Sequence, residues 1–185
     1  MVRLIALDTE TTGMNKRGRA MADLCHGHRI IEVACVEIVD DELTGRQFHR
    51  YINPKCKVDP KAAHIHGLDN KFLKDKPVFK DIVDELLEFI GGSQILIHNA
   101  SFDTAFLDKE FGLLHTNKQP IGTFKIIDTL QMARELFPGA INTLDGLCKR
   151  YGVPGRSEHG ALIDAIILAK VYLGMKQDVF YKKHG

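Results

Sequence analysis

The sequence predicts an α/β fold in which one mixed β-sheet is flanked by helices. Residues 1–52 contain three short stretches with β-branched or alternating apolar side chains, and the later residues alternate short apolar stretches with helical patterns. Adjacent strands along the chain pair antiparallel, whereas strands joined through helices pair parallel, so this order predicts both kinds of pairing. With 185 residues, 44% of them hydrophobic and 26% charged, the chain is long enough for one domain around one core.

The first three strands are expected at residues 3–7, 30–39 and 46–52. The second is rich in β-branched residues, and the third alternates before it stops at Asn53-Pro54. Residues 40–45 join these two strands, which predicts a hairpin.

Helices and two further strands are expected in the rest of the chain. A helix opens at Pro77, has apolar residues at helical spacing and closes at Gly91-Gly92. A second helix, capped by Asn99 or Ser101, reaches about Phe111. The remaining elements are strands at 94–97 and 124–127 and helices near 129–136, 143–151 and 161–173. The sheet therefore has five predicted strands.

The charge balance excludes a long duplex footprint. The 25 Lys and Arg residues against 24 Asp and Glu residues give a formal charge of +1, whereas binding through many phosphates calls for a basic domain. Gripping a few nucleotides at one end needs only local charge.

The sequence also predicts a soluble, cytoplasmic protein without a membrane segment. No apolar run approaches the ~20 residues that span a bilayer, and Asp8 comes too early for a signal peptide. The four cysteines include no Cys-x-x-Cys pair and are expected to be reduced thiols.

Two acids follow the first strand at alternate positions. If the strand continues, Asp8 and Glu10 project from one face and share a site. The pair is equally consistent with two solvated acids at a strand end. Thr11-Thr12-Gly13 then forms a turn whose backbone N–H groups could meet a phosphate.

Two further acids begin later helices. Asp103 lies in a first helical turn, where the helix dipole favours a carboxylate without any functional reason. Asp164 lies in a helix that is apolar around most of its circumference, and no Lys or Arg lies one turn away. A buried carboxylate of this kind must be protonated, paired with a base or bound to a cation.

If the four acids meet, a divalent cation resolves their repulsion. Oxygen ligands suit Mg²⁺ or Mn²⁺ better than Zn²⁺. A protonated carboxylate pair that performs acid–base chemistry, as in glycosidases, is the rival interpretation, but it leaves two acids unexplained.

One histidine stands near the last acid. His159 precedes Asp164 by five residues, and a neutral imidazole can accept a proton from an attacking water at physiological pH. It could equally be a helix-start histidine without a catalytic duty. Cys25-His26-Gly27-His28 has no second ligand pair at zinc-finger spacing and is interpreted as a loop.

Three motifs together resemble the DEDDh exonuclease superfamily, which has a ribonuclease H-like fold. They are Asp8-x-Glu10, His98-Asn99-Ala100-x-Phe102-Asp103 and His159-x-x-x-x-Asp164. The resemblance implies that the four acids hold two divalent ions, Mg²⁺ or Mn²⁺, and that His159 is the general base. It further implies 3′ to 5′ hydrolysis that releases nucleoside 5′-monophosphates from single-stranded or frayed DNA ends.

Within the superfamily, further segments look most like the epsilon proofreading family of bacterial DNA polymerase III. They are residues 65–68, 75–77, 137–139 and 159–165. This likeness covers roughly residues 3–175 and implies an exonuclease domain at 1–176 and a short C-terminal tail at 177–185. It implies as partners the polymerase III catalytic subunit and a small accessory subunit, in the bacterial cytoplasm. Gln177-Asp178-Val179-Phe180 faintly resembles a sliding-clamp binding peptide, and residues 14–28 are longer than the family pattern.

The resemblance also suggests the substrate-binding residues. Phe102, Ile65 and His66 are candidates for the terminal nucleotide pocket. The other candidates are Thr9, Thr11 and Thr12, near the phosphate or sugar, and His98 and Asn99. Phe102 could instead be a core residue, and residues 64–66 a surface turn or a metal pair.

Two alternative functions stay open on the sequence. The same chemistry would trim RNA 3′ ends, because the acids do not distinguish the two sugars. A non-catalytic nucleic-acid-binding scaffold is the second alternative, although all five catalytic positions are filled by competent residues.

Overall fold

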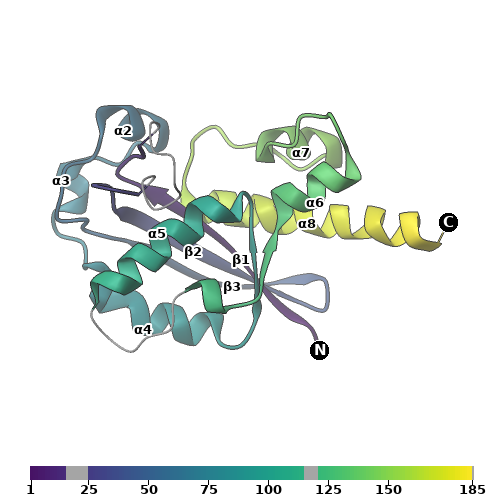
Figure 1. Ribbon diagram of the computed structural model, residues 1–185, viewed down its shortest axis with the longest axis horizontal. Coiled ribbons are helices and arrows are strands. Elements are labelled where there is room, and N and C mark those ends of the chain that lie inside the picture. The colour runs from purple at the N-terminus through teal and green to yellow at the C-terminus, as the bar shows by residue number, and fades with distance from the viewer. Residues whose placement is uncertain (16–24, 115–120, 185) are drawn as a thin grey trace.

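The computed structural model describes residues 1–15, 25–114 and 121–184. Its centre is a five-stranded mixed sheet with the order β3-β2-β1-β4-β5 (Figure 1). The strands are β1 (Arg3–Thr11), β2 (Ile30–Val39), β3 (Glu42–Tyr51), β4 (Gln94–Ile97) and β5 (Ile126–Asp128). β1, β2 and β3 pair antiparallel, whereas β4 pairs parallel with β1 and β5. The predicted fold class is confirmed.

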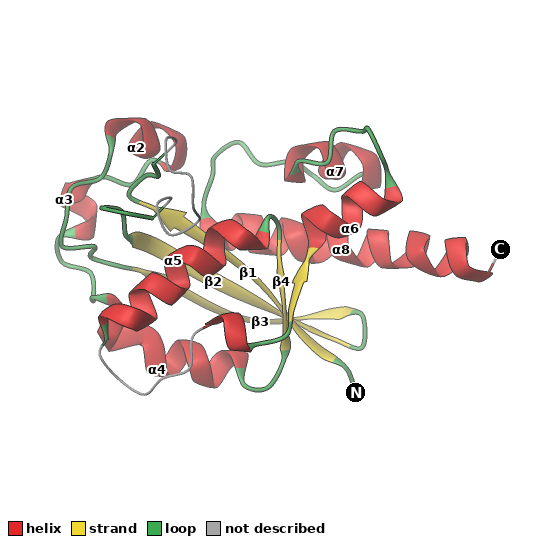
Figure 2. Cartoon of the chain, viewed as in Figure 1, coloured by secondary structure: helices red, strands yellow, loops and turns green. Residues whose placement is uncertain are grey.

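Helices cover both faces of the sheet (Figure 2). They are α2 (Pro60–His66), α3 (Asn70–Leu73), α4 (Phe79–Ile90), α5 (Ala100–Leu113), α6 (Thr129–Leu136), α7 (Leu144–Tyr151) and α8 (Ala161–His184), with a 3₁₀ turn at Ile121–Thr123. Because side chains alternate along a strand, Ile5 and Leu7 of β1 pack against α4 and α5, whereas Leu4 and Ala6 pack against α6, α7 and α8. The sheet therefore separates two apolar clusters, and β1 contributes side chains to both of them.

The hairpin between β2 and β3 is tighter than the sequence predicted. β3 begins at Glu42 rather than at residue 46, and only Asp40 and Asp41 form the turn. Both have positive φ angles, 47° and 69°, which aspartate tolerates better than most residues and which two-residue hairpins require. The predicted six-residue link is thus wrong, because the turn contains neither of the usual Asn-Gly or Asp-Gly signals.

β1 is longer than its apolar stretch. It continues through Asp8 and Glu10 to Thr11, because β2 supplies pairing partners along this whole length. Because the strand continues, Asp8 and Glu10 project from the same face of β1.

Two helices were not predicted, and one was predicted too short. α2 and α3 are short elements between β3 and α4, with Asp59 and Asp69 as their N-caps. α8 continues past Leu173 to His184, so the residues expected to form a separate tail extend this helix. Gln177–Phe180 are accordingly helical. Most of the loop at 14–28 lies outside the described residues.

In the described ranges, no helix combines the length and apolar character that crossing a membrane requires. The structure describes all four cysteines, and none of them forms a disulfide.

Candidate active site

The four acids converge from three elements. Asp8 and Glu10 lie on β1, Asp103 in the first turn of α5, and Asp164 in the first turn of α8. α5 follows β4, which pairs parallel with β1, so the start of α5 reaches the edge of the sheet where β1 ends. The buried Asp103 is tied to β1 because its Oδ1 accepts hydrogen bonds from Thr9 N (3.1 Å) and Thr9 Oγ1 (2.7 Å).

His159 joins the same cluster. Potential ligand atoms of Glu10, His159 and Asp164 all lie within 4.8 Å of one another. His159 Nδ1 is 3.8 Å from Asp164 Oδ2. Glu10 and Asp164 therefore meet in space although 154 positions separate them in the chain.

Burial and the charges of neighbouring carboxylates raise the pKa values of the acids in this cluster. Burial raises the pKa of Glu10 to about 8, with Asp164, Glu32 and Asp103 adding to the shift. Burial also raises the pKa of Asp103 to about 7. The pKa of Asp8 is raised well above its usual range, first by burial and then by the charges of Asp103, Asp164 and Glu10. A site that holds several carboxylates in this state favours a bound cation.

One arginine that the sequence analysis missed lies against Asp164. Arg156, from the loop before α8, has its Nε 3.0 Å from Asp164 Oδ1 and its Nη1 3.1 Å from Asp145 Oδ1. Of the three states expected for a buried Asp164, pairing with a base is therefore observed, and the base comes from a loop that folds back rather than from one helical turn away. Burial nevertheless raises the pKa of Asp164 to about 6, against the opposing charge of Arg156.

The residues present fit a divalent cation. Asp164 Oδ1 is buried and has no hydrogen-bond partner among the described residues, since the contact with Arg156 lacks hydrogen-bond geometry. A buried carboxylate oxygen without a hydrogen-bond partner, on a residue clustered with Glu10 and His159, belongs to an oxygen-rich donor set that Mg²⁺ and Mn²⁺ accept.

His159 is held as a neutral imidazole. Burial and the charge of Arg156 lower its pKa below the usual value, so the ring is unprotonated at pH 7. Arg156 Nε and Nη2 lie 3.3 and 3.1 Å from His159 Nδ1, and the Nε–H donates to it. The lone pair of Nδ1 is therefore engaged by Arg156 in this conformation.

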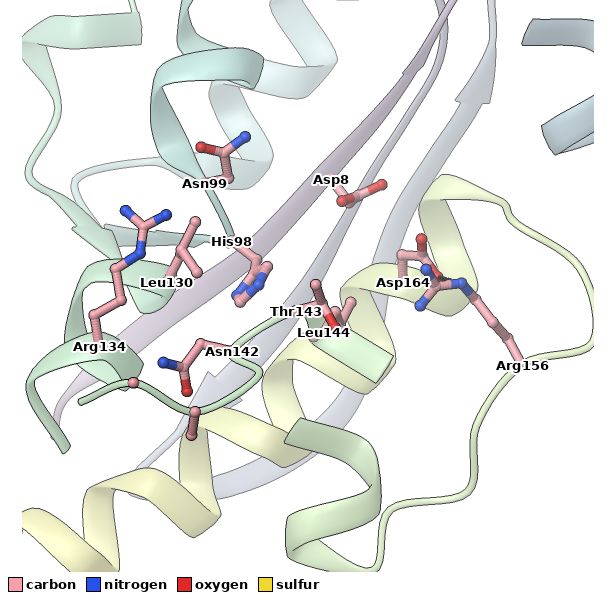
Figure 3. Close-up of a pocket in the computed structure, with 12 residues that line it drawn as sticks. Asp8, His98, Asn99, Leu130, Arg134, Asn142, Thr143, Leu144, Arg156 and Asp164 are labelled. Carbon is pink, nitrogen blue, oxygen red and sulfur yellow. Dashed lines mark ion pairs between the residues drawn. The ribbon is translucent and has the colours of Figure 1, made fainter. Parts of the chain in front are cut away.

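Two cavities adjoin the acid cluster, and α2 and α6 stand on either side of the end of β1 (Figure 1). We call the first the α2 pocket. It has a volume of about 360 Å³ and is lined by Glu10, Thr11, Gly13, Met14, Asp59, Lys61, Ala62, Ile65, His66 and Phe102. We call the second the α6 groove. It has a volume of about 720 Å³ and is lined by Asp8, His98, Asn99, Leu130, Arg134, Gly139, Ala140, Asn142, Thr143, Leu144, Arg156 and Asp164 (Figure 3).

The candidate substrate-binding residues divide between these cavities. Thr11, Ile65, His66 and Phe102 line the α2 pocket, and His98 and Asn99 line the α6 groove. Phe102 also packs on Phe106 of the core, with ring centroids 4.9 Å apart, so both interpretations of this residue apply.

Two candidates line neither cavity. The Thr9 hydroxyl is used by Asp103, and Thr12 is fully buried with its Oγ1 accepting from Arg29 N at 3.0 Å. Thr9 thus orients Asp103, and Thr12 holds the turn after β1 against Arg29. Their role in binding a substrate stays a prediction.

Asp128 is a supporting residue that the sequence analysis missed. Its Oδ1 caps α6 by accepting from Leu130 N (2.9 Å), and it also accepts from Asn99 N (3.1 Å). Its Oδ2 accepts from Ala100 N (3.2 Å) at the start of α5. An Asp-Thr pair before a helix signals an N-cap, but the second role depends on the neighbouring strand and leaves no local signal.

The comparisons with known proteins agree with this geometry. A sequence model of the exonuclease family RNase_T matches residues 5–172. The DNA polymerase III subunit epsilon of Salmonella typhimurium is 51% identical over 178 residues, which are 95% of this chain and 72% of that protein.

Solved structures show the same fold. The nuclease domain of 3′hExo, a DEDDh family member bound to rAMP, aligns with a TM-score of 0.77 at 18% identity over 95% of this chain and 92% of that one. Exonuclease X in complex with 5′ overhanging duplex DNA aligns with a TM-score of 0.69 at 24% identity over 94% of this chain and 91% of that one.

The chain belongs to the exonuclease family, and it is a 3′ to 5′ exonuclease. Within that family its place is among the DNA polymerase III epsilon subunits. The DEDDh exonucleases are metal-dependent, in keeping with the acid cluster of this chain.

Proposed function

We propose that this exonuclease removes nucleotides one at a time from single-stranded or frayed DNA 3′ ends and proofreads for a replicative DNA polymerase. The proposal is supported chiefly by the cluster of Glu10, His159 and Asp164 beside two cavities. Asp8 and Asp103 lie close enough to each other for the charge of Asp103 to raise the pKa of Asp8. The relatives named as polymerase III subunits support the replicative role.

In this proposal Asp8, Glu10, Asp103 and Asp164 hold two divalent cations, Mg²⁺ or Mn²⁺. When bound, these ions activate the attacking water and stabilise the departing 3′ oxygen. Thr9 orients Asp103 through its two hydrogen bonds, so that this carboxylate keeps its direction relative to β1.

His159 is the proposed general base. Its lowered pKa keeps it neutral at pH 7, which is the form that accepts a proton. Because Arg156 engages Nδ1, the guanidinium must move away before that nitrogen takes a proton.

The α2 pocket is the proposed site of the terminal nucleoside. Its volume of about 360 Å³ falls in the ~300–1,000 Å³ range of small-molecule sites. Ile65, with 55% of its surface exposed, and Phe102 offer apolar surface to a base. A pocket for one nucleoside admits an unpaired end, and a mispaired end melts more cheaply than a paired one. Error selectivity then follows from fraying, without base-specific contacts.

A time course on a primer-template with a 3′ mismatch tests the proposal. We expect mononucleotides to appear with Mg²⁺ or Mn²⁺, more slowly from a fully paired primer, and not at all with EDTA. Asp164→Asn serves as the matched inactive control. Products longer than one nucleotide, or no products with either metal, would contradict the proposal.

The choice of DNA over RNA is part of the proposal. Labelled DNA and RNA oligomers of equal sequence provide the comparison, and faster cleavage of RNA would assign the chain to RNA 3′-end trimming.

We also propose the polymerase III catalytic subunit as a binding partner, with a small accessory subunit, in the bacterial cytoplasm. Co-elution of the chain with the catalytic subunit tests the main contact. The sliding clamp is a further proposal that depends on Phe180, which is 59% exposed on α8. An unchanged clamp pull-down with Phe180→Ala would remove it.

A further inference from the structure

We propose that the α6 groove binds the DNA strand on the 5′ side of the scissile phosphate, with Arg134 as a phosphate ligand. The inference deepens the proposed function and depends on it, because it takes the α2 pocket as the site of the terminal nucleoside.

The positions of the α2 pocket and the acids set the direction in which the strand must leave the site. If the terminal nucleoside fills the α2 pocket and its 5′ phosphate lies at the acids, the rest of the strand continues beyond the acids. The α6 groove begins at Asp8 and Asp164, so it opens from the acid cluster itself. Its volume of about 720 Å³ is twice the 360 Å³ of the α2 pocket, which leaves room for more than one nucleotide unit.

The exposed side chain of Arg134 on α6 lines the groove, and Figure 3 shows it on the same side as Asn99, away from Asp164 and Arg156. Within residues 1–15, 25–114 and 121–184 it makes no ion pair or hydrogen bond that would neutralise it. An uncommitted guanidinium suits a phosphate because its planar donors match two oxygens at once.

Arg156 provides the contrast within the same groove. Its guanidinium is engaged by Asp164, Asp145 and His159, and its side chain is only 9% exposed. Of these two arginines, Arg134 is therefore the one whose charge is available to a strand that enters the groove.

Three further polar residues that line the groove, His98, Asn99 and Asn142, are uncharged. Burial lowers the pKa of His98, and its Nδ1 lies 3.0 Å from Thr129 Oγ1, which fixes the ring. Asn142 is only 8% exposed, and its Oδ1 has no hydrogen-bond partner among the described residues. Asn99 has a left-handed backbone conformation (φ 68°, ψ 55°), and its N–H donates a hydrogen bond to Asp128 Oδ1. These uncharged polar groups and one arginine together suit a sugar-phosphate chain of any sequence.

Two substrates that differ only on the 5′ side of the scissile phosphate test the inference. One is an eight-nucleotide oligothymidylate, and the other is the p-nitrophenyl ester of thymidine 5′-monophosphate, which has no strand to occupy the groove. We expect Arg134→Gln to lower kcat/KM about 10-fold for the oligonucleotide, as for a lost charge-assisted hydrogen bond, and less than twofold for the ester. Arg134→Lys should restore part of the loss, because it returns the charge without the fork.

A binding measurement supplies a second readout. Fluorescence anisotropy of the labelled oligonucleotide with EDTA present, taken over a range of salt concentrations, should give a slope of log K against log salt smaller by about 0.7 in Arg134→Gln. Lys170→Gln, which removes an exposed charge on α8 outside both cavities, is the matched control and should keep the wild-type slope.

The outcomes distinguish a failure of the groove assignment from a failure of the proposed function. Equal losses on both substrates, or no loss on either, would overturn the assignment of the groove while the exonuclease proposal stands. A wild-type protein that cleaves neither substrate would overturn the proposed function, and the salt slope would still report whether Arg134 contacts the strand.

Discussion

The α2 pocket and the α6 groove adjoin the same acids but differ in what they offer. The pocket is the smaller and presents Ile65 and Phe102, whereas the groove is twice as large and has an arginine over neutral polar groups. A nucleoside has an apolar base, and a strand has a repeating charge, so the two cavities suit the two parts of a nucleic-acid end. If the two proposed roles hold, the difference teaches that an exonuclease can recognise an end through a small, partly apolar pocket and hold the strand through its backbone, without reading sequence.

The largest effect should come from the acids between the cavities. We expect Asp164→Asn to abolish cleavage of both the oligonucleotide and the nitrophenyl ester, because both cavities depend on the same cluster. The thermal midpoint of the metal-free variant should equal or exceed that of the wild type, since one repelling charge is gone. An active, folded Asp164→Asn protein would show that the cavities do not share a reaction centre.

His159 should have the next largest effect. We expect His159→Ala to lower kcat by roughly 10²–10⁴, and by the same factor on both substrates. A general base acts on the attacking water, which both reactions share, and contacts neither the strand nor the terminal nucleoside. Steady-state kinetics at pH 8 measure this. A loss confined to the oligonucleotide would instead assign His159 to strand binding.

Ile65 distinguishes the pocket from the groove. Ile65→Ala should raise KM about 10-fold for both substrates, because each places a terminal nucleoside against this side chain. The variant should keep the wild-type thermal midpoint, since 55% of the Ile65 surface is exposed. Arg134→Gln is its counterpart, because the groove residue should affect the oligonucleotide alone. If Ile65→Ala changed only the oligonucleotide, the roles of the two cavities would be reversed.

The smallest effect is a dependence of stability on pH in the metal-free protein. An acid whose pKa is higher in the folded chain than in the unfolded chain binds more protons when folded, so stability falls as the pH rises. Because the folded pKa of Glu10 is about 8, we expect the free energy of unfolding to fall by ~1 kcal/mol between pH 7 and 9. The lowered pKa values of His66, His98 and His159 act below this window.

Chemical denaturation with EDTA at each pH measures this loss. The Glu10→Gln variant should show a flatter profile, and Mn²⁺ should recover the lost stability of the wild type at pH 9. A wild-type profile that is flat or rises over this window would show that the folded protein does not raise the pKa of Glu10.

The mixed sheet and most helices were predictable because strand alternation, helical spacing and end signals are local patterns, whereas the strand order depends on which strands pair. β4 and α6 have the predicted bounds, and α4 closes at the predicted glycine pair. The elements that were missed or misplaced lack such signals. The hairpin turn uses two aspartates, and α2 and α3 are too short for helical periodicity to show.

The candidate site shows the same division. The spacing of Asp8 and Glu10 and the buried setting of Asp164 pointed to a shared acid site. Glu10 and Asp164 do lie together, and the charges of both raise the pKa of Asp8. Arg156 was missed because it pairs with Asp164 through a loop rather than a helical turn. Arg134 carried no signal, since an arginine on an amphipathic helix is ordinarily solvated.

The sequence by itself determined which side chains are available and which elements carry them, because strand alternation, helical spacing and capping residues act within a few positions of one another. It also required that a carboxylate in an apolar helix find a compensating charge. Only the tertiary structure decided which threonines are used internally, which arginine is committed and which is free, and that the acids separate two unlike cavities. Thr9 and Asp103 are 94 positions apart, and Arg156 reaches Asp164 and Asp145 only because its loop folds back, so neither contact can be read from the spacing of the residues. Such contacts exist only once β1, α5 and α8 have packed together.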